Sequence, residues 1–356
     1  MMQKLRFKTK YAALFLYFPM IGILPYAIQA RITADLSGII IFPPDNPWHY
    51  DISQFPVHPN SANFVASVGV NTALHPDFGK PDEYGIPYLL VDKNQNKIAI
   101  NYTDYPDESD PGPFPIPLNA PVEGNDPLRG DRHCLAIDKD AKMLYELYIA
   151  IPKQDHWDAA CGAKFDLSSN NLRQDTWTSA DAAGLPILPG LVRYDEIANG
   201  EINHTIRMTV VNTQRKYLWP ARHFASVSTN ENFCPMGLRF RLKASVDISS
   251  LPRAAKIVAT ALKKYGMIVA DNGSDWFISG ASDERMPDDE LSALKTLKGK
   301  DFEAVLSVDA SGNPIQPSVA IRNYGVRDSK IIWDKTGFEA RWFNLLGKTL
   351  SKKKPL

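Results

Sequence analysis

Apolar and polar residues alternate in short runs along most of the chain, which predicts a protein built mainly from β-strands. The alternation repeats every two residues, as the two faces of a strand require, and turn-forming residues separate the runs. The predicted strands cover residues 63–70, 86–91, 96–102, 132–138, 143–151, 203–211, 237–245, 267–271, 275–279 and 301–307.

A few stretches have the period of a helix instead. Residues 252–265 begin with a proline, repeat apolar side chains three and four positions apart, and end before Gly266. Residues 191–199 and 288–297 predict shorter helices. Many strands and few helices indicate a mainly β fold, either a β-sandwich or a jelly roll with a few short helices. An α+β domain is the alternative.

The N-terminal segment has the layout of a secretory signal peptide. Residues 1–10 are basic and contain no acid, residues 11–26 are uncharged and mostly apolar, and a short run of small residues ends at Ala30. An uncleaved membrane anchor is the alternative. The apolar run of about 16 residues is shorter than the roughly 20 that span a bilayer, and Pro19 and Pro25 interrupt it.

Export and cleavage define the expected organisation of the chain. We expect a secreted or periplasmic protein that loses residues 1–30 and has no stable membrane span afterwards. Residues 31–307 then form a single β-rich domain, and residues 308–356, which lose the periodic pattern, form a C-terminal appendage or tail.

Composition narrows the class of protein. The 356 residues are 44% hydrophobic, which excludes a disordered chain and a disulfide-stapled mini-protein. The 40 Lys and Arg residues balance the 40 Asp and Glu residues, so no overall positive charge favours nucleic acid as a partner. The sequence does not indicate an oligomeric state.

Motifs for cofactors and metals are absent from the sequence. Neither GxGxxG nor GxxxxGKS/T occurs, so we predict no nucleotide cofactor. Cys134, Cys161 and Cys234 are too widely spaced for a zinc motif, and the histidines have no metal-ligand spacing, so we predict no metal. In an exported protein one pair of these cysteines can form a disulfide, and the sequence leaves the pairing open.

Glu146 is the one charged residue in the strand predicted at 143–150. Strand alternation places it on the same face as Leu144 and Tyr148. A carboxyl group between apolar neighbours has a raised pKa, as a general acid requires. A glutamate on the solvent side of a sandwich is the alternative.

Two other predicted strands carry basic residues on one face. Arg207 lies opposite the apolar face that holds His204, which we therefore expect in the core, and Arg239, Arg241 and Lys243 alternate with apolar residues. If the two strands are neighbours, these side chains form a cationic stripe that can hold carboxylates, sulfates or phosphates. A solvated face that nearby acids neutralise is the alternative.

Histidines stand next to arginine or aspartate in several loops. Arg132 precedes His133, and Arg222 precedes His223 in a loop that also holds Trp219. His75-Pro76-Asp77 is a third such loop. A histidine beside a cation and a polar neighbour suits proton transfer next to an anion.

The stretch 177–196 mixes apolar residues with prolines, glycines and acids. It fits neither an amphipathic strand nor a helix, and we expect a rigid loop that sets Asp181, Arg193, Asp195 and Glu196 against a packed base. Capping and loop-closing salt bridges are the alternative. Trp177 starts this stretch, and flat aromatic rings in loops can stack on sugar rings.

Four stretches resemble those of a group of exported bacterial proteins known mostly as hypothetical proteins. They are LHPDFG (74–79), YGIPY (84–88), TSADAAGLPILPGLVRYDE (178–196) and WPARHFAS (219–226). The resemblance covers about residues 36–306. It implies a single unit with a peripheral C-terminal segment, and it implies no activity and no catalytic residues.

We therefore predict an exported carbohydrate-active enzyme that acts on a polysaccharide or oligosaccharide, either a hydrolase or a lyase. A hydrolase would use Glu146 with Asp195 or Asp181 as its acid and base. In a lyase Arg207 and Arg222 would neutralise a uronate carboxylate while His223 or a tyrosine takes the proton. The candidate catalytic residues are Glu146, Asp195, Asp181, His133 and His223. The candidate substrate-binding residues are Arg132, Arg193, Arg207, Arg222, Tyr148, Trp177 and Trp219.

Two other classes of function compete with an enzyme. One is an exported module that binds a glycan or a partner without catalysis, and the other is a structural envelope protein. The enzyme hypothesis requires Glu146, Asp195 and one of His133 or His223 to converge in one cleft.

Overall fold

The protein is mainly β, which confirms the predicted fold class. The computed structural model describes residues 33–79, 84–124, 130–309 and 313–316, and the backbone of residues 330–332 and 341–343. The predicted signal peptide, residues 1–30, and most of the predicted appendage, residues 308–356, lie outside the described residues.

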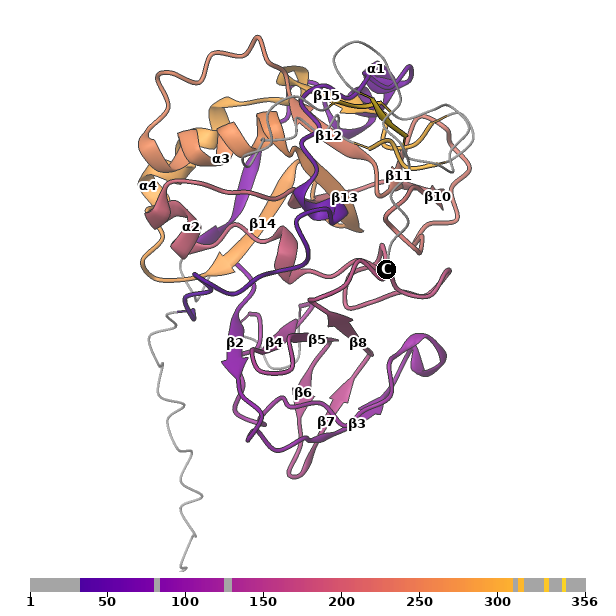
Figure 1. The fold of residues 1–356 in the computed structure, drawn as a ribbon, viewed down its shortest axis with the longest axis vertical. Helices are drawn as coiled ribbons and strands as arrows, with labels where there is room; N and C mark the ends of the chain where they lie inside the picture. The colour runs from indigo at the N-terminus through magenta and orange to yellow at the C-terminus, as the bar shows by residue number, and fades with distance from the viewer. Residues whose placement is uncertain are drawn as a thin grey trace, which may run out of the picture.

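A six-stranded mixed sheet forms the upper half of the molecule (Figure 1). Neighbours β1 and β14 are parallel, as are β9 and β13, and the other pairs are antiparallel. In spatial order its strands are β1 (His75–Gly79), β14 (Phe277–Ser282), β9 (Ile206–Val210), β13 (Met267–Asn272), β12 (Arg239–Leu242) and β15 (Phe302–Val305).

The four α-helices of the described residues lie in the upper half, with the six-stranded sheet (Figure 1). They are α1 (Ser61–Val68), α2 (Tyr194–Asn199), α3 (Arg253–Lys264) and α4 (Asp288–Leu291). Short 3-10 helices lie at Pro47–His49, Pro106–Glu108, Leu188–Gly190, Ser292–Thr296 and Gly299–Asp301. The predicted helix at 252–265 is confirmed as α3, which buries one side and packs against β12.

The predicted strand at 63–70 is wrong, because this segment forms α1. Its buried residues Phe64, Val65 and Val68 are spaced one and three positions apart, which places them on one side of a helix. The helix ends at Gly69, whose φ of 106° favours glycine. Over only eight residues, apolar positions with this spacing fit either a strand or a helix, and packing against β15 decides in favour of the helix.

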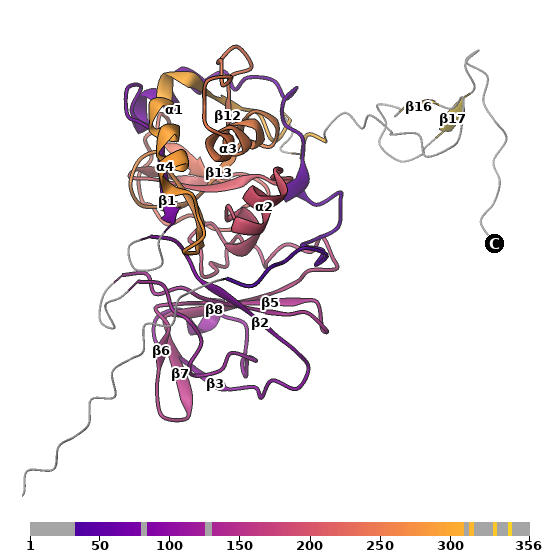
Figure 2. The ribbon, with the colours of Figure 1, turned by 90° about the vertical axis from the view of Figure 1, so that its left-hand side faces the viewer.

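Two smaller sheets form the lower half (Figures 1 and 2). The four-stranded sheet contains β2 (Tyr88–Val91), β4 (Cys134–Asp138), β5 (Met143–Tyr148) and β8 (Cys161–Asp166). The three-stranded sheet contains β3 (Ala99–Tyr102), β7 (His156–Ala159) and β6 (Ile151–Pro152). Two separate pairs are β10 (Thr213–Tyr217) with β11 (Cys234–Met236) and β16 (Lys330–Ile332) with β17 (Arg341–Phe343).

Both faces of the four-stranded sheet are buried. Cys134 and Leu147 lie in a small core with Trp157, between this sheet and the three-stranded sheet. Leu135 and Leu144 point to the other face and join the main core, which extends to the six-stranded sheet. The four-stranded sheet is thus a middle layer, and Glu146, on the Leu144 face, points toward the upper half.

The predicted cationic stripe does not form, because β9 and β12 are not neighbours. Strand β13 lies between them and places Ile268 between Arg207 and Arg239. Arg239 is buried and donates to the hydroxyl of Thr205 and the carbonyl of Pro47. Arg239 therefore binds groups near its own strand and does not continue a row of positive charges from Arg207.

The cysteines are free thiols. Cys134, Cys161 and Cys234 are all buried, and none forms a disulfide. Burial raises the pKa of each thiol, which keeps it protonated and unreactive. Within the described part of the chain, no helix combines the length and apolar character needed to cross a bilayer.

Replacing Trp157 by alanine should lower the free energy of unfolding by about 3–5 kcal/mol. Trp157 is fully buried, and its Nε1 donates to the carbonyl of Ile116 at 3.0 Å. Trp157→Phe, which removes chiefly this hydrogen bond, should cost about 1–3 kcal/mol. Urea unfolding measures both, with Val227→Ala, at a side chain 89% exposed, as the control. Equal stability of Trp157→Ala and the unmodified chain would contradict this core.

Candidate functional site

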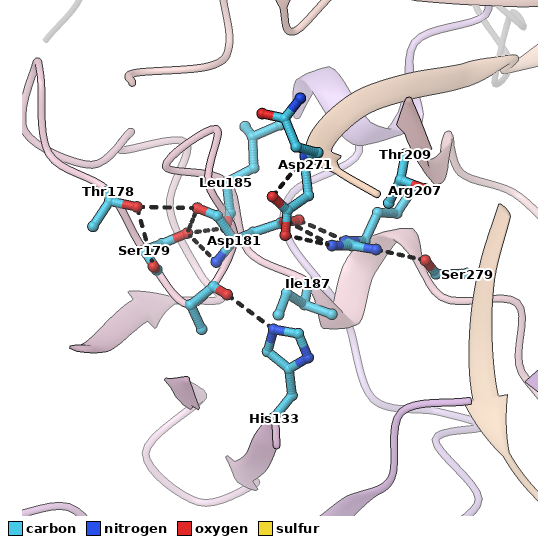
Figure 3. A network of polar contacts seen from close by, with 12 residues as sticks. His133, Thr178, Ser179, Asp181, Leu185, Ile187, Arg207, Thr209, Asp271 and Ser279 are labelled. Carbon is cyan, nitrogen blue, oxygen red and sulfur yellow. Dashed lines mark hydrogen bonds and ion pairs between the residues drawn. The ribbon is translucent and has the colours of Figure 1, made fainter. Parts of the chain in front are cut away.

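The segment 178–190 is a buried loop between the six-stranded and four-stranded sheets. Almost all its residues are buried, yet it has no regular structure before the 3-10 turn Leu188–Gly190. Its backbone N–H and C=O groups therefore need partners from elsewhere. Charged and polar side chains from both sheets supply several of them and assemble the candidate site (Figure 3).

Arg207 anchors the loop to the six-stranded sheet. Its Nε and Nη2 donate to the two carboxylate oxygens of Asp181, each at 2.8 Å, and its Nη1 donates to the hydroxyl of Ser279 at 2.7 Å (Figure 3). Burial alone would lower the pKa of Arg207. The carboxylates of Asp181, Asp271 and Glu123 raise it by more, so the guanidinium stays charged.

Glu146 anchors the loop to the four-stranded sheet. It is fully buried, and its carboxylate accepts the backbone N–H groups of Ile187 and Leu188 at 2.9–3.0 Å. Burial raises the pKa of Glu146 to about 7, against the opposing effect of the two backbone hydrogen bonds. The expected raised pKa is confirmed. The carboxylate binds the loop, however, and is enclosed by protein.

His133 makes a third contact with the loop. Its Nε2 lies 3.1 Å from the carbonyl oxygen of Ala180, and its Nδ1 lies 2.5 Å from Oε2 of Glu123. Both neighbours are acceptors, so both ring nitrogens carry hydrogens. Burial would lower the pKa of His133, but Glu123 raises it to about 9. The ring of Tyr148 lies 5.6 Å away.

The strand register aligns further polar groups with Arg207. Asp77 on β1 pairs with Ser279 on β14, whose hydroxyl accepts the hydrogen bond from Arg207 on β9. Thr209, two residues after Arg207 and on the same face, pairs with Asp271 on β13. One face of the sheet therefore carries Asp77, Ser279, Arg207, Thr209 and Asp271.

A β-bulge decides where Asp271 points. Met208 pairs with Val269, but the next residue, Thr209, pairs with Asp271, so Ala270 is the extra residue. Without the bulge, Asp271 would lie on the opposite face with Val269. The bulge brings its Oδ2 to 3.3 Å from Nη2 of Arg207.

Asp271 and Glu123 are partly exposed carboxylates of this network. Their side chains are 19% and 25% exposed, whereas Asp181 is fully buried. Burial and the neighbouring Asp181 raise the pKa of Asp271 to about 7. Burial would also raise the pKa of Glu123, but His133 lowers it overall. Burial and Glu123 raise the pKa of the half-buried Asp77.

The structure therefore brings together Glu146, Asp181, His133 and Arg207, with Tyr148 beside His133. These predicted residues come from separate segments of the chain. They contact one buried loop, as the rigid-loop interpretation of 177–196 expects.

Asp195 and Arg193 belong to a different cluster at the start of α2. Arg193 Nη2 lies 2.5 Å from Oε1 of Glu196, and its Nε lies 3.5 Å from Asp195. His204, buried as expected, contacts the same Glu196 at 2.9 Å. These contacts match the capping and salt-bridge alternative. Asp195 contacts Arg193, whereas Glu146 binds Ile187 and Leu188, so the structure does not support Glu146 and Asp195 as an acid and base pair.

The remaining predicted residues also have local partners. Arg222 pairs with Asp175 at 2.8 Å, and His223 Nδ1 lies 2.8 Å from the carbonyl oxygen of Ala182. Arg132 Nε donates to the carbonyl of Ala150 at 3.1 Å.

The predicted tryptophans also pack locally. The Trp177 ring lies 5.4 Å from the Arg173 guanidinium. The Trp219 ring lies 5.8 Å from the ring of Tyr50. Among the described residues, neither tryptophan ring stacks against Arg207 or its partners.

Sequence reasoning missed Asp271, Glu123 and Ser279. Asp271 is the last residue of the strand predicted at 267–271, and that prediction gave its side chain no role. The predicted loop at His75-Pro76-Asp77 is wrong, because these residues form the start of β1, and Asp77 was not among the predicted site residues. The one available signal for Glu123 was its place in a long polar loop, a common location for functional residues.

A groove of about 600 Å³ lies elsewhere, along α3. Arg253, Lys256, Ile257, Lys264 and Glu201 are among its lining residues. It holds none of the predicted site residues. Among the described residues, no group of three or more His, Cys, Asp or Glu side chains forms a metal site.

No protein-family model, no curated protein and no solved structure matches this chain. Function is therefore argued from the chemistry of the site.

Asp181→Asn should lower the free energy of unfolding by about 3–5 kcal/mol, because it leaves a buried guanidinium without its main counter-charge. Asp175→Asn is the matched control, since Asp175 also pairs with an arginine but is 57% exposed. It should change stability by less than about 1 kcal/mol. Chemical unfolding of both variants measures the difference, and equal effects would contradict the anchoring role of Asp181.

Glu146→Gln should change the pH dependence of stability. The folded pKa of about 7 is above the ordinary 4.5, so the stability that wild-type Glu146 contributes is complete below pH 4.5 and is lost as pH rises through 7. The difference in unfolding free energy between the wild type and Glu146→Gln should therefore fall over this range, by at most about 3 kcal/mol. Glu231→Gln, at a side chain 85% exposed, should show no such slope. A pH-independent difference for Glu146→Gln would refute the raised pKa.

Proposed function

We propose that the protein is an exported glycoside hydrolase in which Asp271 is the general acid and Glu123 is the catalytic carboxylate. The observation that carries the proposal is a pair of partly exposed carboxylates in one network, with pKa values displaced in opposite directions. Glycoside hydrolysis needs one protonated and one ionised carboxyl group at the same time.

In the proposed reaction, Asp271 donates its proton to the glycosidic oxygen as the bond from that oxygen to the anomeric carbon breaks. Glu123 faces the positive charge that develops on the sugar. It either bonds to the anomeric carbon or takes a proton from the water that attacks it. Water supplies the new hydroxyl group in both cases, and the separation of the carboxyl groups along the bound substrate selects the route.

Buried charges keep the two carboxyl groups in these states. His133 holds Glu123 ionised through the 2.5 Å contact. Asp181 disfavours a second negative charge on Asp271, and Arg207 orients the Asp271 carboxyl group. Asp181, Arg207, His133 and Glu146 are positioning residues in this proposal.

A hydrolase is favoured over a lyase because the arginines proposed for the lyase are engaged. Arg207 donates to Asp181, Ser279 and Asp271 through four of its five N–H groups, and Arg222 pairs with Asp175. Neither guanidinium is free to neutralise a uronate carboxylate. The export part of the proposal rests on the signal-like residues 1–30.

Asp271→Asn and Glu123→Gln should each reduce hydrolysis of a responsive polysaccharide by about 10²–10⁴-fold. Asp175→Asn, a surface substitution outside the site, should leave the rate unchanged. Activity should be lost as pH rises through about 7, where Asp271 loses its proton. It should also be lost as pH falls through the lowered pKa of Glu123, below 4.5.

Release of reducing ends from a polysaccharide panel is the measurement. Full activity of both site variants would refute the assignment of acid and base. Unsaturated products that absorb in the ultraviolet would indicate a lyase instead. Glycan binding with no product from any substrate would indicate a binding module.

A further inference from the structure

Three aromatic rings gather at the edge of the six-stranded sheet. The rings of His75 on β1 and Phe277 on β14 are stacked, with centroids 4.0 Å apart and planes 15° apart. Tyr84 meets His75 edge-on at 6.2 Å, and 44% of Tyr84 is exposed. We name these three residues the aromatic platform.

Residues that pair across neighbouring strands form a row, and strand register places His75 and Phe277 of the platform in the same row as Asp271. His75 pairs with Phe277, Phe277 pairs with Thr209, and Thr209 pairs with Asp271. Paired residues point to the same face of a sheet, and adjacent strands are about 4.8 Å apart. Phe277 and Asp271 are two strand spacings apart, so their Cα atoms lie about 10 Å from each other across the sheet. This distance is about the length of two sugar units.

The platform row is half-buried throughout, whereas the row beside it is buried at Arg207 and Ser279 and half-buried at Asp77. His75, Phe277, Thr209 and Asp271 are all half-buried, but Arg207 and Ser279 in the next row are buried. Among the described residues, Phe277 is part of none of the three hydrophobic clusters. A phenylalanine that stays out of the core leaves apolar surface for a ligand.

The charges around this row disfavour an anionic ligand. The reachable ionisable groups beside Asp271 are the carboxyl groups of Asp77 and Glu123 and the exposed Asp131. Near Asp271 the cations Arg207 and His133 are buried and paired with acids, whereas the exposed Lys295 acts on the platform at His75. Burial and Lys295 lower the pKa of His75, so its ring is neutral at pH 7 and suits apolar stacking.

We propose that the aromatic platform is a subsite that stacks on a pyranose ring of an uncharged glycan and so presents a neighbouring glycosidic bond to Asp271. This inference rests on the proposed function and names its substrate class, a neutral polysaccharide. The apolar face of a pyranose packs on aromatic rings, and its hydroxyl groups then face the polar row of the sheet.

Binding and catalysis are measured separately to test the subsite. Neutral cello-, xylo-, manno- and malto-oligosaccharides and an oligouronate are titrated calorimetrically into the Asp271→Asn chain, in which the proposed acid is silenced. A neutral oligosaccharide should bind, and the oligouronate should bind at least about tenfold more weakly. His75→Ala or Phe277→Ala in the same background should weaken binding by about tenfold.

Two further variants separate stacking from folding. His75→Phe keeps a flat ring and should restore binding, and Tyr84→Ala removes an exposed ring and should weaken binding without loss of stability. His58→Ala is the matched control, because His58 also packs on a phenylalanine, Phe64, at 5.0 Å, but next to β15 at the opposite edge of the sheet. It should bind as the parent does.

The outcomes distinguish the two proposals. Unchanged binding in the folded Phe277→Ala and Tyr84→Ala variants overturns the platform, whatever the chain hydrolyses. Tighter binding of the oligouronate than of every neutral oligosaccharide also overturns it. Platform-dependent binding of a neutral glycan together with full hydrolysis by Asp271→Asn supports the platform and refutes the proposed acid.

Discussion

The structure depends on burying an irregular loop between two sheets. Residues 178–190 form no helix or strand before Leu188, and a buried backbone group without a partner is costly. Glu146 supplies such partners to the N–H groups of Ile187 and Leu188 from the four-stranded sheet, and Arg207 fixes the loop to the six-stranded sheet through the side chain of Asp181. The main hydrophobic core also extends from the six-stranded sheet through this loop to the four-stranded sheet, so the loop connects the two halves of the molecule.

The same arrangement has electrostatic consequences for the proposed site. Buried charges act on their neighbours through a medium that screens them weakly, so a fixed cation or anion shifts every nearby pKa. His133 keeps Glu123 ionised, while Asp181 and burial keep Asp271 protonated up to about pH 7. Groups that hold the loop in place thereby set opposite protonation states on these two partly exposed carboxyl groups.

The sequence could identify many parts of the site but could not group them. His133, Glu146, Asp181 and Arg207 each stood out because a charged residue appeared within an apolar pattern or a rigid loop, and the structure brings them together. Asp195 carried the same kind of signal but lies in the first turn of α2 beside Arg193. Asp271 was missed because strand alternation assigns it to the wrong face unless the bulge at Ala270 is known.

The sequence by itself determined the mainly β fold, the helix at 253–264 and the irregular backbone of residues 178–187, because these follow from local periodicity and from proline and glycine. The tertiary structure alone decided that 61–68 is a helix, that β13 separates Arg207 from Arg239, and that Asp271 faces Arg207. Strand order and bulges depend on contacts between residues distant along the chain. A pattern read within one segment therefore shows which side chains share a face, and only packing shows what that face meets.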